Sequence, residues 1–297
     1  MTLVVTGANG EFGRIALDSA IAAAPGERVI ASVRDPGNAN DLVERGIEVR
    51  PGSFDDPDQL RDTFMGADTV LVNATFFGAT PGMRGERVAS AIRAAADAGA
   101  GRIVLTSWPD LDHCPLPEVQ DYVASEALLR SAGPDWTILR LGYGLADTLA
   151  RDVLWGHRDG ELVAPAGDAT SAPAAVSDLA EVAGLVAVST EHSGRSYELT
   201  GPRAIGWTEL AELASELHGG SVPYRPVTDD DYRSHLGSLG LHKTFADGLI
   251  ALYAAFRSGW ASRPDPTLGR LLGRPPVDGP DAVRGRLERM RRLLGGR

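Results

Sequence analysis

Three glycines close to the amino terminus place the strongest constraint on the fold. Gly7, Gly10 and Gly13 follow the short apolar run Thr2–Thr6, and apolar residues then recur at helical spacing as far as Ala23. This order predicts a strand, a glycine-rich turn and a helix that begins at the turn. Because the backbone N–H groups at such a helix N-terminus can receive a pyrophosphate, the sequence predicts a dinucleotide-binding loop.

The residue after the second predicted strand indicates which dinucleotide binds. Residues 28–33 form that strand, and Arg34 follows it where NAD-binding domains usually carry Asp or Glu. A carboxylate would repel a 2′-phosphate, whereas a guanidinium can pair with it in a forked geometry. We therefore expect NADP(H) as the cofactor, the alternative being that Arg34 is a solvated surface arginine.

Short apolar runs and helical patterns alternate along the following hundred residues. Such near-continuous apolar strands with intervening helices are typical of a parallel sheet covered on both faces. Asp56 and Pro57 supply an N-cap and a first-turn proline for one of the helices. Strands are predicted at 47–50, 69–73, 102–107 and 136–141, and helices at 57–64, 82–98 and 118–131.

The alternation weakens after residue 142. Residues 142–173 look like a crossing segment, an apolar helix is predicted to begin at Asp178, and residues 196–200 are predicted to return to the sheet as a seventh strand. We expect an α/β fold, namely a Rossmann-type doubly wound parallel sheet with a smaller C-terminal α/β cap domain over the carboxyl edge of the sheet. The predicted NADP-binding domain spans residues 1–142 with 176–200, and the predicted cap spans 143–175 and 201–297.

Bulk composition disfavours several classes of partner. A net charge of −11 argues against nucleic acid, and no apolar run approaches the roughly 20 residues of a membrane span. Cys114 is the sole cysteine, and the amino terminus enters a strand directly, so a reducing, cytoplasmic location without a signal peptide is predicted. The Arg-rich stretch 284–292 interleaves with apolar residues at helical spacing and predicts an amphipathic terminal helix.

The chain lacks the catalytic pair of most short-chain dehydrogenases, which share this kind of fold. These enzymes use a YxxxK pair, but here Glu126 stands four residues after Tyr122, and the sole lysine is Lys243. The six histidines show no metal-ligand spacing, so no metal site is predicted. Hydride transfer with little acid–base help suits an acceptor that is already electrophilic, such as a quinone, an enone or a delocalised cation.

Characteristic segments are distributed along nearly the whole chain. They are TGANGEFGR, ASVRDP, LTSWPD, SEALLRSAGPDWTILRLGY, APAGDATSAPAAVSDLAE, SYELTGP, WTELAELASE and PVTDDDYRSHLGSLGL. Together they resemble the NmrA-like group of atypical short-chain dehydrogenases, and within it the type 2 NADPH:quinone oxidoreductases and triphenylmethane reductases. The resemblance implies an NADPH-binding reductase of quinones or similar conjugated compounds.

The resemblance also implies a set of site residues. Tyr122 and Tyr143 are the candidate catalytic residues, each with packing as the alternative role. The phosphate loop would be Gly7, Asn9, Gly10, Glu11 and Phe12, with Arg34 on the 2′-phosphate. Phe54 would flank the adenine, Asn73, Ala74 and Thr75 would line the middle of the cofactor, and Ser107, Gly142 and Tyr143 would lie near the nicotinamide.

Three features depart from the family pattern. Ser53 follows Gly52 where related sequences often carry Asp, and Tyr122 replaces a histidine. Phe76 and Phe77 are bulkier than the usual small residues. The identity of the substrate is therefore the least transferable inference.

The function expected is that of an NADPH-dependent reductase that transfers hydride to a small conjugated electrophile, quinone- or enone-like. A secondary-metabolite tailoring enzyme is a sharper variant, because the Arg-for-Lys bias suggests a high-GC bacterial source. The alternative class is a non-catalytic NADP-binding redox sensor of the NmrA type that regulates a partner protein. The cap, with its expected substrate pocket, favours an enzyme, and a homodimer is left open.

Overall fold

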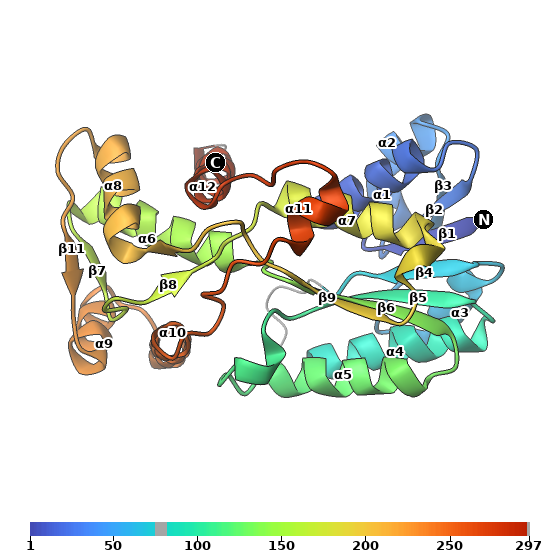
Figure 1. Ribbon diagram of the computed structural model, residues 1–297, viewed down its shortest axis with the longest axis horizontal. Helices are drawn as coiled ribbons and strands as arrows, with labels where there is room; N and C mark the ends of the chain where they lie inside the picture. The colour runs from blue at the N-terminus through green and yellow to red at the C-terminus, as the bar shows by residue number, and fades with distance from the viewer. Residues whose placement is uncertain (75–81, 296–297) are drawn as a thin grey trace.

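Seven parallel strands form the central sheet of the computed structural model, which describes residues 1–74 and 82–295 (Figure 1). The strand order is β3-β2-β1-β4-β5-β6-β9, so the order reverses between β1 and β4 as in a doubly wound sheet. The predicted fold class is confirmed. The strands are β1 (Thr2–Thr6), β2 (Arg28–Val33), β3 (Glu48–Pro51), β4 (Thr69–Val72), β5 (Arg102–Ser107), β6 (Asp135–Leu141) and β9 (Arg195–Leu199).

Helices cover both faces of this sheet (Figure 1). Alternate residues of β1 point to opposite faces, so Leu3 and Val5 join one apolar core and Val4 joins the other. One face carries α1 (Glu11–Ala23), α2 (Asn40–Glu44), α7 (Val176–Val188) and α11 (Thr267–Leu272), and the other carries α3 (Pro57–Phe64), α4 (Met83–Asp97) and α5 (Val119–Ser131). Short 3-10 turns lie at Pro36–Asn38, Leu111–His113 and Thr190–His192.

Two predicted helix starts, at Asp56 and at Asp178, can be compared with the structure. Asp56 caps α3 by accepting a hydrogen bond from the Gln59 backbone N–H at 3.0 Å, as predicted. The prediction that Asp178 begins α7 is wrong, because α7 starts at Val176. The buried Asp178 carboxylate instead accepts hydrogen bonds from the Val277 N–H and the Arg274 guanidinium, and so ties a distant segment to this helix.

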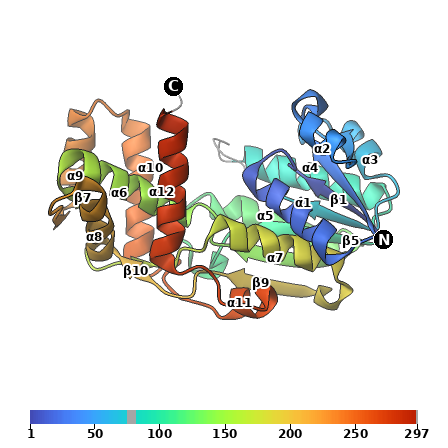
Figure 2. The ribbon, with the colours of Figure 1, turned by 90° about the horizontal axis from the view of Figure 1, so that it is seen from above.

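The remaining elements form a second lobe, the cap, beside the carboxyl edge of the sheet (Figures 1 and 2). Its strands make two small sheets, in which β7 (Leu162–Ala164) pairs with β11 (Tyr224–Pro226) and β8 (Thr170–Ser171) pairs with β10 (Ile205–Gly206). Its helices are α6 (Leu145–Asp159), α8 (Trp207–His218), α9 (Asp229–Ser238), α10 (Lys243–Arg257) and α12 (Gly279–Gly295). Although α11 falls within the range predicted for the cap, it packs against α7 and β9 of the sheet lobe.

The expected crossing segment at 142–173 contains a helix, α6, of 15 residues, followed by the short strands β7 and β8. Leu145, Leu149 and Val153 recur every four residues and are buried against the rest of the cap. Gly144 and Gly160 flank the helix with positive φ, which is why the sequence around it resembles a loop. A helix N-terminus therefore follows β6 after a short turn.

A buried polar group anchors the aromatic core of the cap. The Asp152 carboxylate accepts hydrogen bonds from Trp207 Nε1 at 2.9 Å and from the Tyr253 hydroxyl at 2.7 Å. The amphipathic terminal helix is confirmed as α12, which packs against α6 and buries Val283 and Leu287. Among the helices of the described residues, none combines the length and apolar character needed to cross a bilayer.

Candidate active site

A cavity of about 250 Å³ lies where the carboxyl ends of β4, β5 and β6 meet the cap. Ligands in doubly wound sheets bind at this edge. The sheet lobe lines it with Ala74, Ser107, Trp108, Tyr122 and Tyr143, and the cap lines it with Leu145, Thr148, Leu252 and Trp260. The cavity therefore brings together both candidate catalytic tyrosines and residues predicted to lie near the nicotinamide.

Three glycines of the loop between β1 and α1 lie where a Cβ atom would be tightly placed. Gly7 has φ +64°, and a Cβ there would lie 3.3 Å from Asn73 Nδ2. A Cβ on Gly13 would lie only 2.2 Å from the Gly7 carbonyl oxygen, and one on Gly10 would lie 3.3 Å from the same atom. Asn73 is held in turn by a hydrogen bond from its N–H to Thr6 Oγ1 at 2.8 Å. This cradle fits a dinucleotide, which needs close approach of the backbone.

The other predicted loop residues are fixed by their neighbours. Asn9 donates through Nδ2 to the Asn38 carbonyl at 3.0 Å. Phe12 is buried and meets the Tyr143 ring edge to face, with ring centroids 5.8 Å apart. The Glu11 carboxylate accepts a hydrogen bond from Arg286 of α12, a contact that sequence reasoning missed.

The predicted adenosine end lies at the carboxyl end of β2. Arg34 is exposed and forms no hydrogen bond or ion pair with the rest of the described chain. Next to Phe54, Asp55 receives two hydrogen bonds from Arg87, at 2.7 and 2.8 Å. These bonds, with a smaller contribution from the charge of Arg34, lower the pKa of Asp55. Thr75, Phe76 and Phe77 lie outside the described residues.

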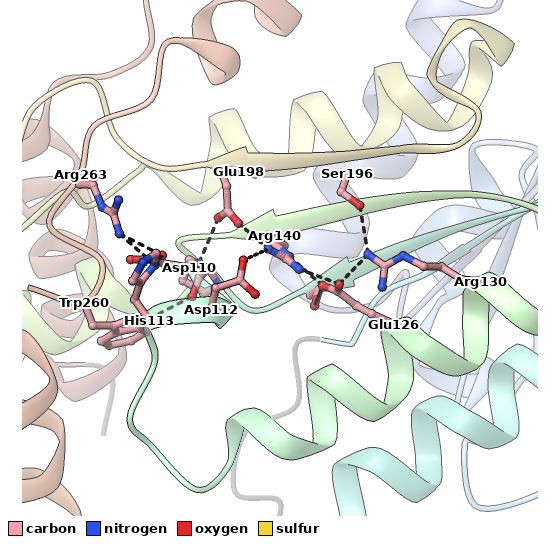
Figure 3. A network of polar contacts seen from close by, with 12 residues as sticks. Asp110, Asp112, His113, Glu126, Arg130, Arg140, Ser196, Glu198, Trp260 and Arg263 are labelled. Atoms are coloured by element: carbon pink, nitrogen blue, oxygen red, sulfur yellow. Dashed lines mark hydrogen bonds and ion pairs between the residues drawn. The ribbon is translucent and has the colours of Figure 1, made fainter.

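A buried carboxylate supports Ser107 at the end of β5. Ser107 Oγ donates to Glu126 Oε1 at 2.8 Å, and Glu126 is 1% exposed. Arg140 donates to both oxygens of Glu126 at 2.9 Å, and Arg130 donates to Oε2 at 3.0 Å. Figure 3 shows how Arg140 also reaches Glu198, which accepts from Nη1 at 3.0 Å. Position 126, where the lysine of the YxxxK pair would stand, is thus occupied by a carboxylate whose charge is balanced by two arginines.

This network controls the ionisation of its carboxylates. Burial by itself would raise the pKa of Glu126, but the hydrogen bonds from Arg140 and Ser107 bring it below its ordinary value. Burial raises the pKa of Glu198, although the Asp110 N–H and Arg140 both donate to it. Ionised Glu126 can only accept hydrogen bonds, so the Ser107 hydroxyl donates its hydrogen to Glu126. Its oxygen lone pairs remain available to accept a hydrogen bond from another group.

Two tryptophans and Tyr122 form an aromatic wall across the two lobes. Trp108, which follows β5, stacks on Trp260 of the cap with centroids 5.8 Å apart and an interplanar angle of 7°. Tyr122 of α5 lies on Trp108 at 5.1 Å. Trp260 Nε1 donates to the Pro109 carbonyl at 3.0 Å, which fixes the indole (Figure 3).

Both candidate catalytic tyrosines stay protonated at neutral pH. Burial raises the pKa of Tyr122 well above its ordinary value and raises the pKa of Tyr143 to about 12. A tyrosine with so high a pKa remains a hydrogen-bond donor at neutral pH but gives up its proton reluctantly. No group of three or more His, Cys, Asp or Glu side chains in the described ranges is arranged to hold a metal ion.

Sequence reasoning missed the arginines of the site. Arg140 interrupts the apolar run of β6, and this charge in a central strand was the available signal. Arg286 could not be distinguished from the other arginines of the terminal helix. Both side chains act on carboxylates from elements far away in the sequence.

Residues 7–187 match the model of the NAD(P)H-binding family, and they span the glycine loop and most of the cavity lining. The chain belongs to this family. The match supports the predicted dinucleotide, while the role of each loop residue stays a prediction.

Several known proteins are similar along nearly their whole length. Quinone oxidoreductase 2 of Escherichia coli is 29% identical, with 92% of this chain and 94% of that protein covered. The (4-alkanoyl-5-oxo-2,5-dihydrofuran-3-yl)methyl phosphate reductase of Streptomyces griseus is 29% identical, with 92% and 93% covered. The crystal structure of the Citrobacter sp. triphenylmethane reductase complexed with NADP(H) is 26% identical, covers 97% of this chain and 100% of its own, and superposes with a TM-score of 0.85. The predicted resemblance is confirmed.

Proposed function

We propose that this protein is an NADPH-dependent reductase that transfers hydride to a small conjugated electrophile, quinone- or enone-like, in the cavity between sheet and cap. The observation that carries the proposal is the absence, among the described lining residues, of an acid that titrates near neutrality. Tyr122 and Tyr143 have raised pKa values, and the Glu126 carboxyl behind Ser107 has a lowered one. Such a site suits acceptors whose reduced form is a stable anion that water can protonate.

The glycine loop would hold the cofactor. Gly7, Asn9, Gly10, Glu11 and Phe12 would present their backbone to the pyrophosphate, because the glycines allow it to approach the backbone closely. The exposed Arg34 would pair with the 2′-phosphate, which favours NADPH over NADH. Phe54 would flank the adenine, and Asn73, Ala74, Ser107, Gly142 and Tyr143 would line the path to the nicotinamide. Bound there, NADPH supplies the hydride.

The chain's own residues would position the acceptor and exclude water. The stacked pair Trp108 and Trp260 offers a flat apolar wall for a conjugated ring. The Tyr122 hydroxyl would donate a hydrogen bond to the acceptor oxygen, which stabilises the negative charge that develops there. Ser107, already donating to Glu126, would accept from an N–H or O–H group.

Two narrower proposals concern the biological setting. A tailoring role in secondary metabolism is supported by the likeness to the Streptomyces griseus reductase, whose name gives as substrate an α,β-unsaturated lactone with an alkanoyl substituent and a methyl phosphate group. A reducing, cytoplasmic location agrees with the single cysteine, Cys114, which cannot form an intrachain disulfide. A homodimer stays a prediction.

The test is NADPH oxidation by the purified protein with a panel of quinones, enones and triphenylmethane dyes, with NADH in parallel. We expect turnover that depends on the acceptor and prefers NADPH. Tight NADPH binding with no turnover across the panel would contradict the reductase and favour the non-catalytic redox sensor.

A further inference from the structure

A cluster of buried ion pairs joins the C-terminal helix to the glycine loop. Arg286 of α12 donates through Nη1 to Glu11 Oε2 at 2.6 Å and through Nε to Asp147 Oδ1 at 2.8 Å. Arg289 Nε lies 3.1 Å from the same Glu11 oxygen. The Arg286, Asp147 and Glu11 side chains are only 11%, 17% and 22% exposed. The cluster therefore connects α1, α6 and α12 across the two lobes.

The Glu11 carboxylate lies at the helix end that we expect to bind the pyrophosphate, so the two negative charges oppose each other. It is the first residue of α1, directly after the N-cap Gly10. A carboxylate at a helix N-terminus is favourable for the isolated helix. The same N-terminus would receive the pyrophosphate, so an unpaired Glu11 carboxylate would repel it at short range.

Arg286 is held in a fixed orientation by two carboxylates. Asp147, in the first turn of α6, binds one edge of the guanidinium while Glu11 binds the other. Val283 and Leu287, on the same helix, are buried in the cap core, so the backbone that carries Arg286 is also fixed. The two carboxylates together therefore hold the guanidinium in one orientation.

We propose that Arg286 is a positioning residue for the cofactor: by pairing with Glu11 it removes a negative charge from the phosphate approach, so a cap residue sets the affinity of the loop for the dinucleotide. This inference rests on the proposed placement of the cofactor on the glycine loop. The pairing also couples the two lobes. Since the packed position of α12 raises the affinity for the cofactor, cofactor binding must in turn stabilise that position of α12.

The experiment compares wild type with Arg286→Gln, Glu11→Gln and the double variant, each titrated with NADP⁺ by calorimetry at low and high NaCl. We expect Arg286→Gln to weaken binding about tenfold, because Glu11 loses its counter-charge. Glu11→Gln removes the opposing charge and should bind more tightly than wild type, and the double variant should bind more tightly than Arg286→Gln. Asp147 loses its partner in both Arg286 variants, so their difference reports the Glu11 charge alone. The Arg286→Gln defect should shrink at high salt.

Two controls separate this role from folding. Arg284→Gln alters a neighbouring arginine that pairs with Glu216 at 2.9 Å and should keep wild-type affinity. Adenosine 2′-monophosphate lacks a pyrophosphate, so it should bind wild type and Arg286→Gln equally. Should Arg286→Gln fail to fold, Arg289→Gln removes the second, 41% exposed partner of Glu11 and should show a smaller loss that Glu11→Gln likewise rescues.

The outcomes are decisive in both directions. Rescue by Glu11→Gln supports the inference. Equal losses in Arg286→Gln and the double variant, or unchanged affinity in Arg286→Gln, overturn it while leaving the proposed function intact. If wild type binds no NADP⁺, the proposed function fails and this inference falls with it.

Discussion

The two ends of the candidate active site are built in opposite ways. At the phosphate end, backbone atoms form the site, and the requirement on Gly7, Gly10 and Gly13 is the absence of a side chain. At the substrate end, large side chains from distant segments form it, with Trp108 stacked on Trp260 and Ser107 held by Glu126 and Arg140. The first kind of site tolerates almost no substitution, whereas the second can change its acceptor by exchanging side chains.

The difference indicates how one scaffold could serve several acceptors. A glycine cradle suits a cofactor that is the same for every member of a family. An aromatic cavity shared between two lobes can be altered without disturbing the cradle, because its lining comes mostly from loop and cap residues. Four substitutions test whether the two ends are as different as their construction suggests.

The largest effect is expected for Gly13→Ala at the phosphate end. The new Cβ would lie 2.2 Å from a backbone oxygen that has no room to move, so we expect a loss of about 3 kcal/mol or more of stability together with loss of NADPH binding. Thermal unfolding and calorimetric titration measure the two. Gly248→Ala is the matched control, since its Cβ would meet nothing within 4 Å and it lies in a helix. Wild-type affinity in Gly13→Ala would refute the backbone cradle.

At the substrate end, Arg140→Met should destabilise the protein by about 3 kcal/mol in urea unfolding, because it leaves buried Glu126 without its bidentate partner. Arg130→Met removes the more exposed donor and should cost less than about 1 kcal/mol. Equal costs would show that the carboxylate does not depend on Arg140.

The pH dependence of that difference has a definite sign. The pKa of Glu126 lies below its ordinary value of 4.5, so its pairing stabilises the fold above that pH and is lost as pH falls through the folded-state value. The gap in stability between wild type and Arg140→Met should therefore narrow on acidification below pH 4.5. A gap that does not narrow would contradict an ionised Glu126 that is paired with Arg140.

Arg34→Ala tests the adenosine end of the site, where we expect a charged side chain rather than the backbone to distinguish NADPH from NADH. Loss of a charge-assisted hydrogen bond to the 2′-phosphate should cost about 1.5–3 kcal/mol in NADPH binding and leave NADH binding nearly unchanged. Dissociation constants for both cofactors measure this. Arg45→Ala removes another surface arginine of the same lobe, paired with Asp18, and should affect neither cofactor. Equal losses for NADPH and NADH would remove Arg34 from the 2′-phosphate.

The same contrast explains what the sequence could and could not predict. The glycine loop is local, so spacing over Gly7–Gly13 was enough to predict strand, turn and helix. The apolar runs likewise predicted most of the seven strands. Helix α6 was missed because glycines bound it on both sides. The Glu126–Arg140 and Glu11–Arg286 pairs join residues 14 and 275 positions apart, and no local pattern reports such contacts. Side-chain sites assembled by the tertiary fold require the structure.

The smallest effect is expected for Tyr122→Phe, which tests whether the substrate end contributes a proton or only a hydrogen bond. Because burial raises the pKa of Tyr122, we expect a loss of only about tenfold in kcat/KM, the size of one hydrogen bond to developing charge. The pH profile should stay flat from about 6 to 9 in both proteins, since neither Tyr122 nor Glu126 titrates there. Tyr197→Phe, at an edge strand where the hydroxyl meets His192, is the control and should be neutral. A loss of about a thousandfold, or a new limb in the wild-type profile, would make Tyr122 a general acid and the substrate end a conventional catalytic centre.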